Sequence, residues 1–126
     1  MAEGKFGTAV ACIDGRAYGP VVEWIKKEFG VEYVDLVTAP GVDGVMVQHN
    51  AKKIGELKEA IGVSAAVHKS GVVVVAGHFD CAGNPVTEEE HKAEIRRDAE
   101  MVKSWGLGVE VAGVWVNESW EVERVA

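Results

Sequence analysis

The chain is poor in cysteine, with only Cys12 and Cys81 among its 126 residues. Two cysteines are too few for the disulfide framework of a small secreted protein. The chain also lacks any apolar run near the roughly 20 residues that a membrane-spanning helix needs, and its first residues lack the apolar segment of a signal peptide. We therefore expect no membrane association and a cytoplasmic location, where such cysteines serve more often as metal ligands or redox groups than in structural disulfides.

Positive charge is also scarce, because 13 Lys and Arg residues stand against 20 Asp and Glu residues, for a net charge of −7. Binding to nucleic acid depends on Lys and Arg side chains that neutralise phosphates, so we expect no nucleic-acid partner. The hydrophobic fraction of 48% and the charged fraction of 26% are typical of a globular protein. This length and composition predict a single domain over residues 1–126.

Strand and helix patterns alternate along the chain, which predicts an α/β fold. We expect a mostly parallel central sheet, with four parallel strands and an antiparallel edge strand, and helices on both faces. The expected strands are residues 6–11, 33–37, 72–76, 109–116 and 120–125. The expected helices are residues 20–28, 51–61, 64–69 and 87–105, with a loop or short helix before residue 51. Gly55 weakens the prediction for 51–61, because glycine disfavours a helix interior.

Chemically reactive side chains follow two of the expected strands. Cys12-Ile13-Asp14-Gly15-Arg16 comes directly after Thr8–Ala11, and His78-Phe79-Asp80-Cys81 comes soon after Val72–Val75. Both stretches are expected at the carboxyl ends of parallel strands, the edge of an open α/β sheet where ligand sites form. The sequence therefore predicts one functional site that both stretches build.

Two cysteines and one histidine form a donor set that suits zinc, which favours sulfur and nitrogen ligands in four-coordinate geometry. Three protein ligands leave a fourth position open, as in catalytic rather than structural zinc sites. The His-x-x-Cys spacing lets one turn after a strand present both His78 and Cys81 to a single ion. Cys12 would approach that ion from a neighbouring strand.

The joint pattern Cys-x-Asp-x-Arg followed by His-x-x-Cys resembles the signature of the β-class carbonic anhydrases. The resemblance implies that Cys12, His78 and Cys81 bind Zn2+, and that Asp14 and Arg16 form a catalytic dyad beside it. It implies reversible hydration of carbon dioxide to bicarbonate by a metal-bound hydroxide, in a homodimer or higher homo-oligomer. Asp14 either accepts a proton from zinc-bound water or binds the metal itself, and both arrangements occur in that family.

Two departures from the family pattern leave other functions open. Ala82 stands where the family usually has glycine, with Gly83 next, and Thr38-Ala39-Pro40-Gly41 lacks the usual asparagine before Ala-Gly. One alternative is hydrolysis of another small heterocumulene, carbonyl sulfide or carbon disulfide. A second is zinc binding without catalysis. A third is thiol redox chemistry between Cys12 and Cys81, which the absence of a Cys-x-x-Cys motif disfavours.

Other polar residues have weaker functional interpretations. Three further histidines are possible proton shuttles by residue type alone, although each is more often an ordinary surface or helix-face residue: His49, His68 and His91. Asp80 is expected to be solvated or to contact His78. The cluster Glu88–Glu90 favours a helix start over a metal site, and Trp120 on the expected edge strand is compatible with a dimer.

Overall fold

The computed structural model describes residues 3–126, which form a five-stranded sheet in the order β2-β1-β3-β4-β5. The strands are β1 (Phe6–Ala11), β2 (Tyr33–Thr38), β3 (Val72–His78), β4 (Glu110–Val116) and β5 (Val122–Arg124). The first four are parallel, and β5 pairs antiparallel with β4 at the edge. The predicted fold class, a mostly parallel sheet with one antiparallel edge strand, is confirmed.

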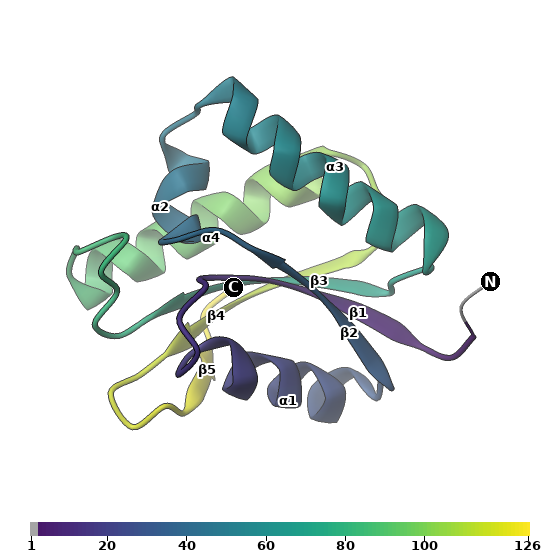
Figure 1. The fold of residues 1–126 in the computed structure, drawn as a ribbon, viewed down its shortest axis with the longest axis horizontal. Coiled ribbons are helices and arrows are strands. Elements are labelled where there is room, and N and C mark those ends of the chain that lie inside the picture. Colours follow the sequence, from purple (N-terminus) through teal and green to yellow (C-terminus); the bar gives the residue numbers. More distant parts are fainter. Residues whose placement is uncertain (1–2) are drawn as a thin grey trace.

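Helices cover both faces of this sheet, as predicted. Helix α1 (Tyr18–Phe29) lies on one face, and α2 (Val42–Val47), α3 (Ala51–Val67) and α4 (Glu88–Ser104) lie on the other (Figure 1). Side chains of a strand alternate between faces. Val72, Val74 and Ala76 of β3 accordingly pack in the cluster that includes α1, whereas Val73 and Val75 pack with α2, α3 and α4. Burial on both faces explains the unbroken valine run in β3.

Helix α3 differs from the prediction, which divided it into residues 51–61 and 64–69. The structure has one helix over Ala51–Val67, because Leu57, Ile61 and Ser64 recur on one buried face. Gly55 does not interrupt it, and a Cβ added there would meet no atom within 4 Å. Packing of the apolar face therefore outweighs the low helix propensity of glycine.

The region around β5 also differs from the prediction. The edge strand spans only Val122–Arg124 instead of residues 120–125. Trp120 lies in the turn before it, with a left-handed φ of 59° and its N–H donating to the Asn117 carbonyl. The placement of Trp120 on an edge strand was therefore wrong.

Helix α4 begins as predicted, because the Thr87 side chain accepts a hydrogen bond from the Glu90 N–H at 3.1 Å. Glu88–Glu90 form its acidic first turn. Across the residues that the structure describes, no helix combines the length and the apolar character required to cross a membrane.

Candidate metal centre

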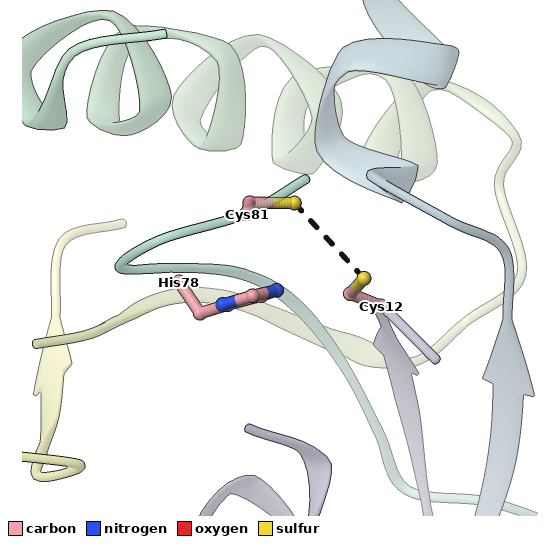
Figure 2. Close-up of side chains that lie close together, drawn as sticks. All are labelled: Cys12, His78 and Cys81. Carbon is pink, nitrogen blue, oxygen red and sulfur yellow. Dashed lines mark hydrogen bonds between the residues drawn. The ribbon is translucent and has the colours of Figure 1, made fainter. Parts of the chain in front are cut away.

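The three predicted metal ligands converge at the carboxyl ends of β1 and β3. These strands are neighbours in the sheet, so Cys12 directly after β1 lies beside His78 at the end of β3 and Cys81 three residues later. Their ligand atoms all lie within 4.8 Å of one another, and all three residues are buried. The side chains point toward a common space (Figure 2). The fold therefore assembles from distant segments a cluster that could hold a metal ion.

The orientation of His78 suits metal binding. Its Nδ1 lies 2.7 Å from the carbonyl oxygen of Phe79, so Nδ1 carries the proton that it donates and Nε2 keeps a free electron pair. Nε2 is buried and has no hydrogen-bond partner within residues 3–126. A buried polar atom without a partner is costly in free energy. A metal ion would satisfy this atom.

The two sulfur atoms are close but not bonded to each other. The Sγ atoms of Cys12 and Cys81 lie 4.0 Å apart, about twice the length of a disulfide bond. Burial, and then the neighbouring Cys12, raise the pKa of the Cys81 thiol to about 11. The Gly41 N–H donates to the Cys12 sulfur at 3.3 Å. A bound divalent cation would favour both thiolates, so the donor set fits a metal that prefers sulfur and nitrogen.

Asp14 and Arg16 form a tight ion pair on the loop after β1. Arg16 Nη2 donates to Asp14 Oδ2 at 2.7 Å, and Arg16 Nε donates to Oδ1 at 3.0 Å. The side-chain and backbone hydrogen bonds from Arg16 lower the pKa of Asp14 to about 2. The pair's contribution to stability is therefore fully present above about pH 4 and is lost as the pH falls through about 2. Asp14 is therefore ionised at neutral pH.

Arg16 has two further contacts that the sequence did not reveal. Its Nη1 donates to Asp80 Oδ2 and its Nη2 donates to the Asp80 carbonyl, both at 3.3 Å. The guanidinium carbon also lies 4.7 Å from the centroid of the Trp120 ring. Asp80 is exposed, as expected, but its partner is Arg16 rather than His78. The loop after β1, the loop after β3 and the turn before β5 thus meet around one guanidinium group.

Comparisons with known proteins bear on this arrangement. A family model described as "Putative carbonic anhydrase" matches residues 2–126. The chain belongs to this carbonic anhydrase family. No curated protein sequence matches the chain significantly.

Solved structures show that the fold is that of the β-carbonic anhydrases. A carbonic anhydrase from Glaciozyma antarctica superposes with a TM-score of 0.60 at 14% identity, covering 94% of this chain and 81% of that chain. A β-carbonic anhydrase from Trichomonas vaginalis gives 0.56 at 13% identity, covering 94% and 81%. One described as a tetrameric β-carbonic anhydrase from Sordaria macrospora gives 0.54 at 14% identity, covering 99% and 82%.

The two loops that depart from the carbonic anhydrase pattern contact each other through Gly41 and Gly83. Gly41 has a left-handed φ of 57°, and a Cβ built on it would lie 2.4 Å from the Gly83 carbonyl carbon. A Cβ built on Gly83 would lie 2.7 Å from the Gly41 nitrogen. Ala82 is exposed and stands before the glycine that makes this contact. The loop after β3 therefore requires its glycine at position 83, one residue after the position that is usual in the family.

We expect Gly83→Ala to lower the free energy of unfolding by about 1–3 kcal/mol. The added methyl group would lie within 2.8 Å of backbone atoms of Pro40 and Gly41, which cannot move as easily as a side chain. Gly55→Ala is the matched control. A Cβ there meets no atom within 4 Å, so the same change should stabilise the protein by up to about 1 kcal/mol through helix propensity. Urea unfolding of both variants checks this. Equal effects of the two substitutions would contradict the tight contact between the loops.

A buried polar network that the sequence analysis missed supports these loops. The Asn84 amide donates to Asp43 Oδ1 at 3.1 Å and to Glu94 Oε2 at 3.3 Å. The other Asp43 oxygen, Oδ2, binds His91 Nδ1. Burial alone would lower the pKa of His91, but the hydrogen bond that its Nδ1–H donates to the Asp43 carboxylate holds that pKa above its ordinary value. Asn84 thereby ties the Cys81 loop to α2 and α4.

The sequence contains one indication of this buried network, a glycine inside strand β3. Gly77 interrupts the valine-rich strand β3, and a glycine inside a strand often marks a close approach by another group. A Cβ at Gly77 would lie 2.4 Å from Asp43 Oδ2. The glycine therefore makes room for the buried carboxylate.

The three histidines proposed as shuttles have different surroundings. His91 is buried against Asp43 rather than on a surface or an open helix face. His68 binds Asp35 Oδ2 at 2.6 Å and stacks near Phe6, at the amino ends of the strands and away from the metal cluster. His49 is exposed between α2 and α3. None of the three belongs to the Cys12–His78–Cys81 cluster.

Asp98 on α4 is fully buried, and both carboxylate oxygens lack a hydrogen-bond partner within the described residues. Burial, and then the nearby carboxylates of Asp43 and Glu94, raise its pKa from 3.8 to about 9. The folded protein thus keeps a proton that the unfolded chain loses near pH 4. Unfolding then releases a proton between these values, so Asp98 makes stability fall as the pH rises from about 4 to 9.

We expect Asp98→Asn to raise the stability at pH 7 by more than about 1 kcal/mol, since it removes the cost of holding this proton. The gain should shrink as the pH falls toward 4. Glu100→Gln on the same helix is the control, because its exposed side chain should change stability little. Thermal unfolding across this pH range makes the comparison. A gain for Asp98→Asn that does not vary with pH would argue that Asp98 stays ionised.

Proposed function

We propose that this protein is a zinc enzyme that catalyses reversible hydration of carbon dioxide to bicarbonate. The supporting observation is the buried cluster of Cys12, His78 and Cys81, with an unpartnered imidazole nitrogen, beside a carboxylate held by an arginine. Membership of the carbonic anhydrase family agrees with this chemistry. Zinc suits two thiolates and one imidazole and keeps a fourth position for reacting groups.

Cys12 and Cys81 would hold the zinc through sulfur, and His78 through Nε2. When bound, zinc would supply Lewis acidity, which lowers the pKa of water and polarises a carbonyl group. The Phe79 carbonyl fixes the His78 ring by accepting its Nδ1–H, the kind of partner that orients metal-binding histidines. The Gly41 N–H donates to the Cys12 sulfur and would offset part of the negative charge of a metal-bound thiolate. These two contacts fix the His78 ring and the Cys12 sulfur in positions that suit a shared metal ion.

We propose that Asp14 acts as a hydrogen-bond acceptor beside the metal rather than as a fourth ligand. Both of its oxygens accept hydrogen bonds from Arg16, and it does not join the thiol and imidazole cluster. An ionised carboxylate fixed in this way can orient an attacking water by accepting a hydrogen bond from it. Arg16 keeps the carboxylate ionised and in one orientation.

The proposal is tested by stopped-flow measurement of carbon dioxide hydration on zinc-loaded protein, with the metal content measured on the same sample. We expect about one zinc per chain and turnover well above the buffer rate. Full zinc occupancy without turnover of carbon dioxide would overturn the proposed reaction. Parallel assays with carbonyl sulfide and carbon disulfide then show whether the centre hydrolyses a related substrate or only binds metal.

We further propose that the protein assembles as a homodimer or higher homo-oligomer. The Sordaria macrospora enzymes of the same fold are described as tetrameric. In this chain, Tyr33 and Leu36 on edge strand β2 are 51% and 41% exposed, and Val63 and Val67 on the neighbouring helix α3 are 53% and 48% exposed. Exposed apolar side chains gathered on adjacent elements are typical of interaction surfaces. Light scattering after size-exclusion chromatography that finds a monomer at micromolar concentration would contradict this assembly.

A further inference from the structure

Trp120 has an unusual backbone conformation for a large side chain. Its φ of 59° lies in the left-handed region, which strongly favours glycine and is an outlier for bulky residues. Asn117 fixes the turn, because its Oδ1 accepts hydrogen bonds from the N–H groups of Ser119 at 2.9 Å and Glu121 at 3.0 Å. Strained residues of this kind persist where surrounding contacts hold them, and they cluster at functional sites.

The strained turn directs the indole ring onto the Asp14–Arg16 pair. The Arg16 guanidinium carbon lies 4.7 Å from the centroid of the Trp120 ring, within cation–π range. The His78 ring lies on the same side of the site, with its centroid 6.4 Å from that of Trp120. Trp120 is half-buried and packs against the core cluster on the α1 face. Its position is therefore fixed by the core rather than by Arg16.

Arg16 needs such a fixed partner, because its side chain is 49% exposed. An exposed ion pair to Asp14 alone is weakly stabilising and leaves the side chain mobile in water. The Trp120 ring lies against the guanidinium group, while the nitrogens of that group donate to Asp14 and Asp80. The ring contact and the hydrogen bonds together restrict the orientation of the Arg16 side chain.

We propose that Trp120 is a positioning residue for the reaction and that its left-handed backbone is retained for this purpose. Trp120 holds Arg16, and Arg16 in turn holds the Asp14 carboxylate at the metal centre. The catalytic part of this inference rests on the proposed function. The placement of Arg16 by Trp120 does not, and it can be measured on the protein in the absence of any substrate.

The placement is tested by NMR of the Arg16 side chain, assigned by comparison with Arg16→Lys. In the wild-type protein the Trp120 ring current should shift the Arg16 side-chain protons upfield. Trp120→Gly should abolish this shift, and Trp120→Phe should keep a reduced one. Trp105→Leu is the matched control, because Trp105 is also half-buried and has the Lys58 ammonium 5.5 Å from its ring centroid. An Arg16 spectrum unchanged in Trp120→Gly would overturn the inference.

The catalytic consequence is tested on the same variants with zinc bound. Trp120→Gly should lower kcat by about tenfold, the order expected from loss of one cation–π contact near a reacting group. Zinc affinity should stay within about twofold, since the centroids of the Trp120 and His78 rings lie 6.4 Å apart and the two side chains share no hydrogen bond. Trp120→Phe should restore most of the activity. Glycine adopts the left-handed φ of position 120 without strain. Asparagine also tolerates this φ, so Trp120→Asn replaces Trp120→Gly in both experiments if the glycine variant does not fold.

The outcomes separate this inference from the proposed function. If the wild-type protein shows no hydration activity but the Arg16 resonances respond to Trp120→Gly, the proposed reaction fails and the positioning of Arg16 stands. If the wild-type protein is active and Trp120→Gly keeps full kcat, Trp120 has no role in the reaction. A loss of kcat accompanied by loss of zinc would also overturn the inference, because Trp120 would then act through the metal ligands.

Discussion

Replacing Cys81 with serine is expected to lower zinc affinity by more than about 100-fold. This loss exceeds the one typical of replacing a residue that only hydrogen-bonds to a metal ligand. It should also remove any stabilisation by zinc. For the wild-type protein, free zinc at about 1,000 times its dissociation constant should add about 4 kcal/mol to the free energy of unfolding. Competition with a chromogenic chelator and thermal unfolding with and without zinc measure both effects. Metal binding and folding are linked here because distant segments supply the ligands.

Ala82→Ser is the matched control for Cys81→Ser, because it introduces the same side chain at the next, exposed position. It should bind zinc like the wild-type protein. Affinity in the wild type should also fall as the pH drops, since the pKa of the Cys81 thiol without metal is about 11 and binding must displace its proton. Full zinc retention in Cys81→Ser, or an affinity that does not change between pH 6 and 8, would remove Cys81 from the ligand set.

Replacing Asp14 with asparagine is expected to lower kcat by roughly 100- to 1,000-fold, the range typical of removing one fixed polar group that acts on the reacting atoms. Zinc content should be unchanged, because Asp14 lies outside the thiol and imidazole cluster. The amide carries no negative charge, and it accepts hydrogen bonds from Arg16 through one oxygen instead of two. Stopped-flow hydration and metal analysis on one sample separate the two effects.

Asp80→Asn is the control for Asp14→Asn, because Asp80 contacts Arg16 from the other side and is more exposed. We expect its kcat to stay within a few-fold of the wild type, as is usual for a solvent-exposed ion pair. The pKa of Asp14 is about 2, so the carboxylate stays ionised at any working pH. A rate in Asp14→Asn equal to that of Asp80→Asn would exclude Asp14 from the mechanism.

The sequence was most informative where a strand leads directly into reactive side chains. Parallel strands bring their carboxyl ends to one edge, so the proximity of Cys12 to His78 followed from two local patterns and their order. The distance between the sulfur atoms, the free Nε2 of His78 and its contact with Phe79 depend on loop conformation. Local residue types do not determine such conformations.

Contacts between elements far apart in the chain could not be predicted in this way. Asp43 and His91 each stand alone in the sequence, and only the packing of α2 against α4 pairs them. Trp120 was assigned to a strand because its neighbours alternate between apolar and polar residues, but a turn held by Asn117 placed it over Arg16. In α3, burial of Leu57 and Ile61 overrode the local preference of the glycines.

The contact between Gly41 and Gly83 also constrains how this protein can evolve. One glycine lies beside the Cys12 sulfur and the other lies two residues after Cys81, so each loop limits the space of the other. Once either glycine is replaced, the loops must separate, and a second replacement then costs less than it would alone. The two positions are therefore expected to show strong epistasis and to be inherited together, although 42 residues separate them in the sequence.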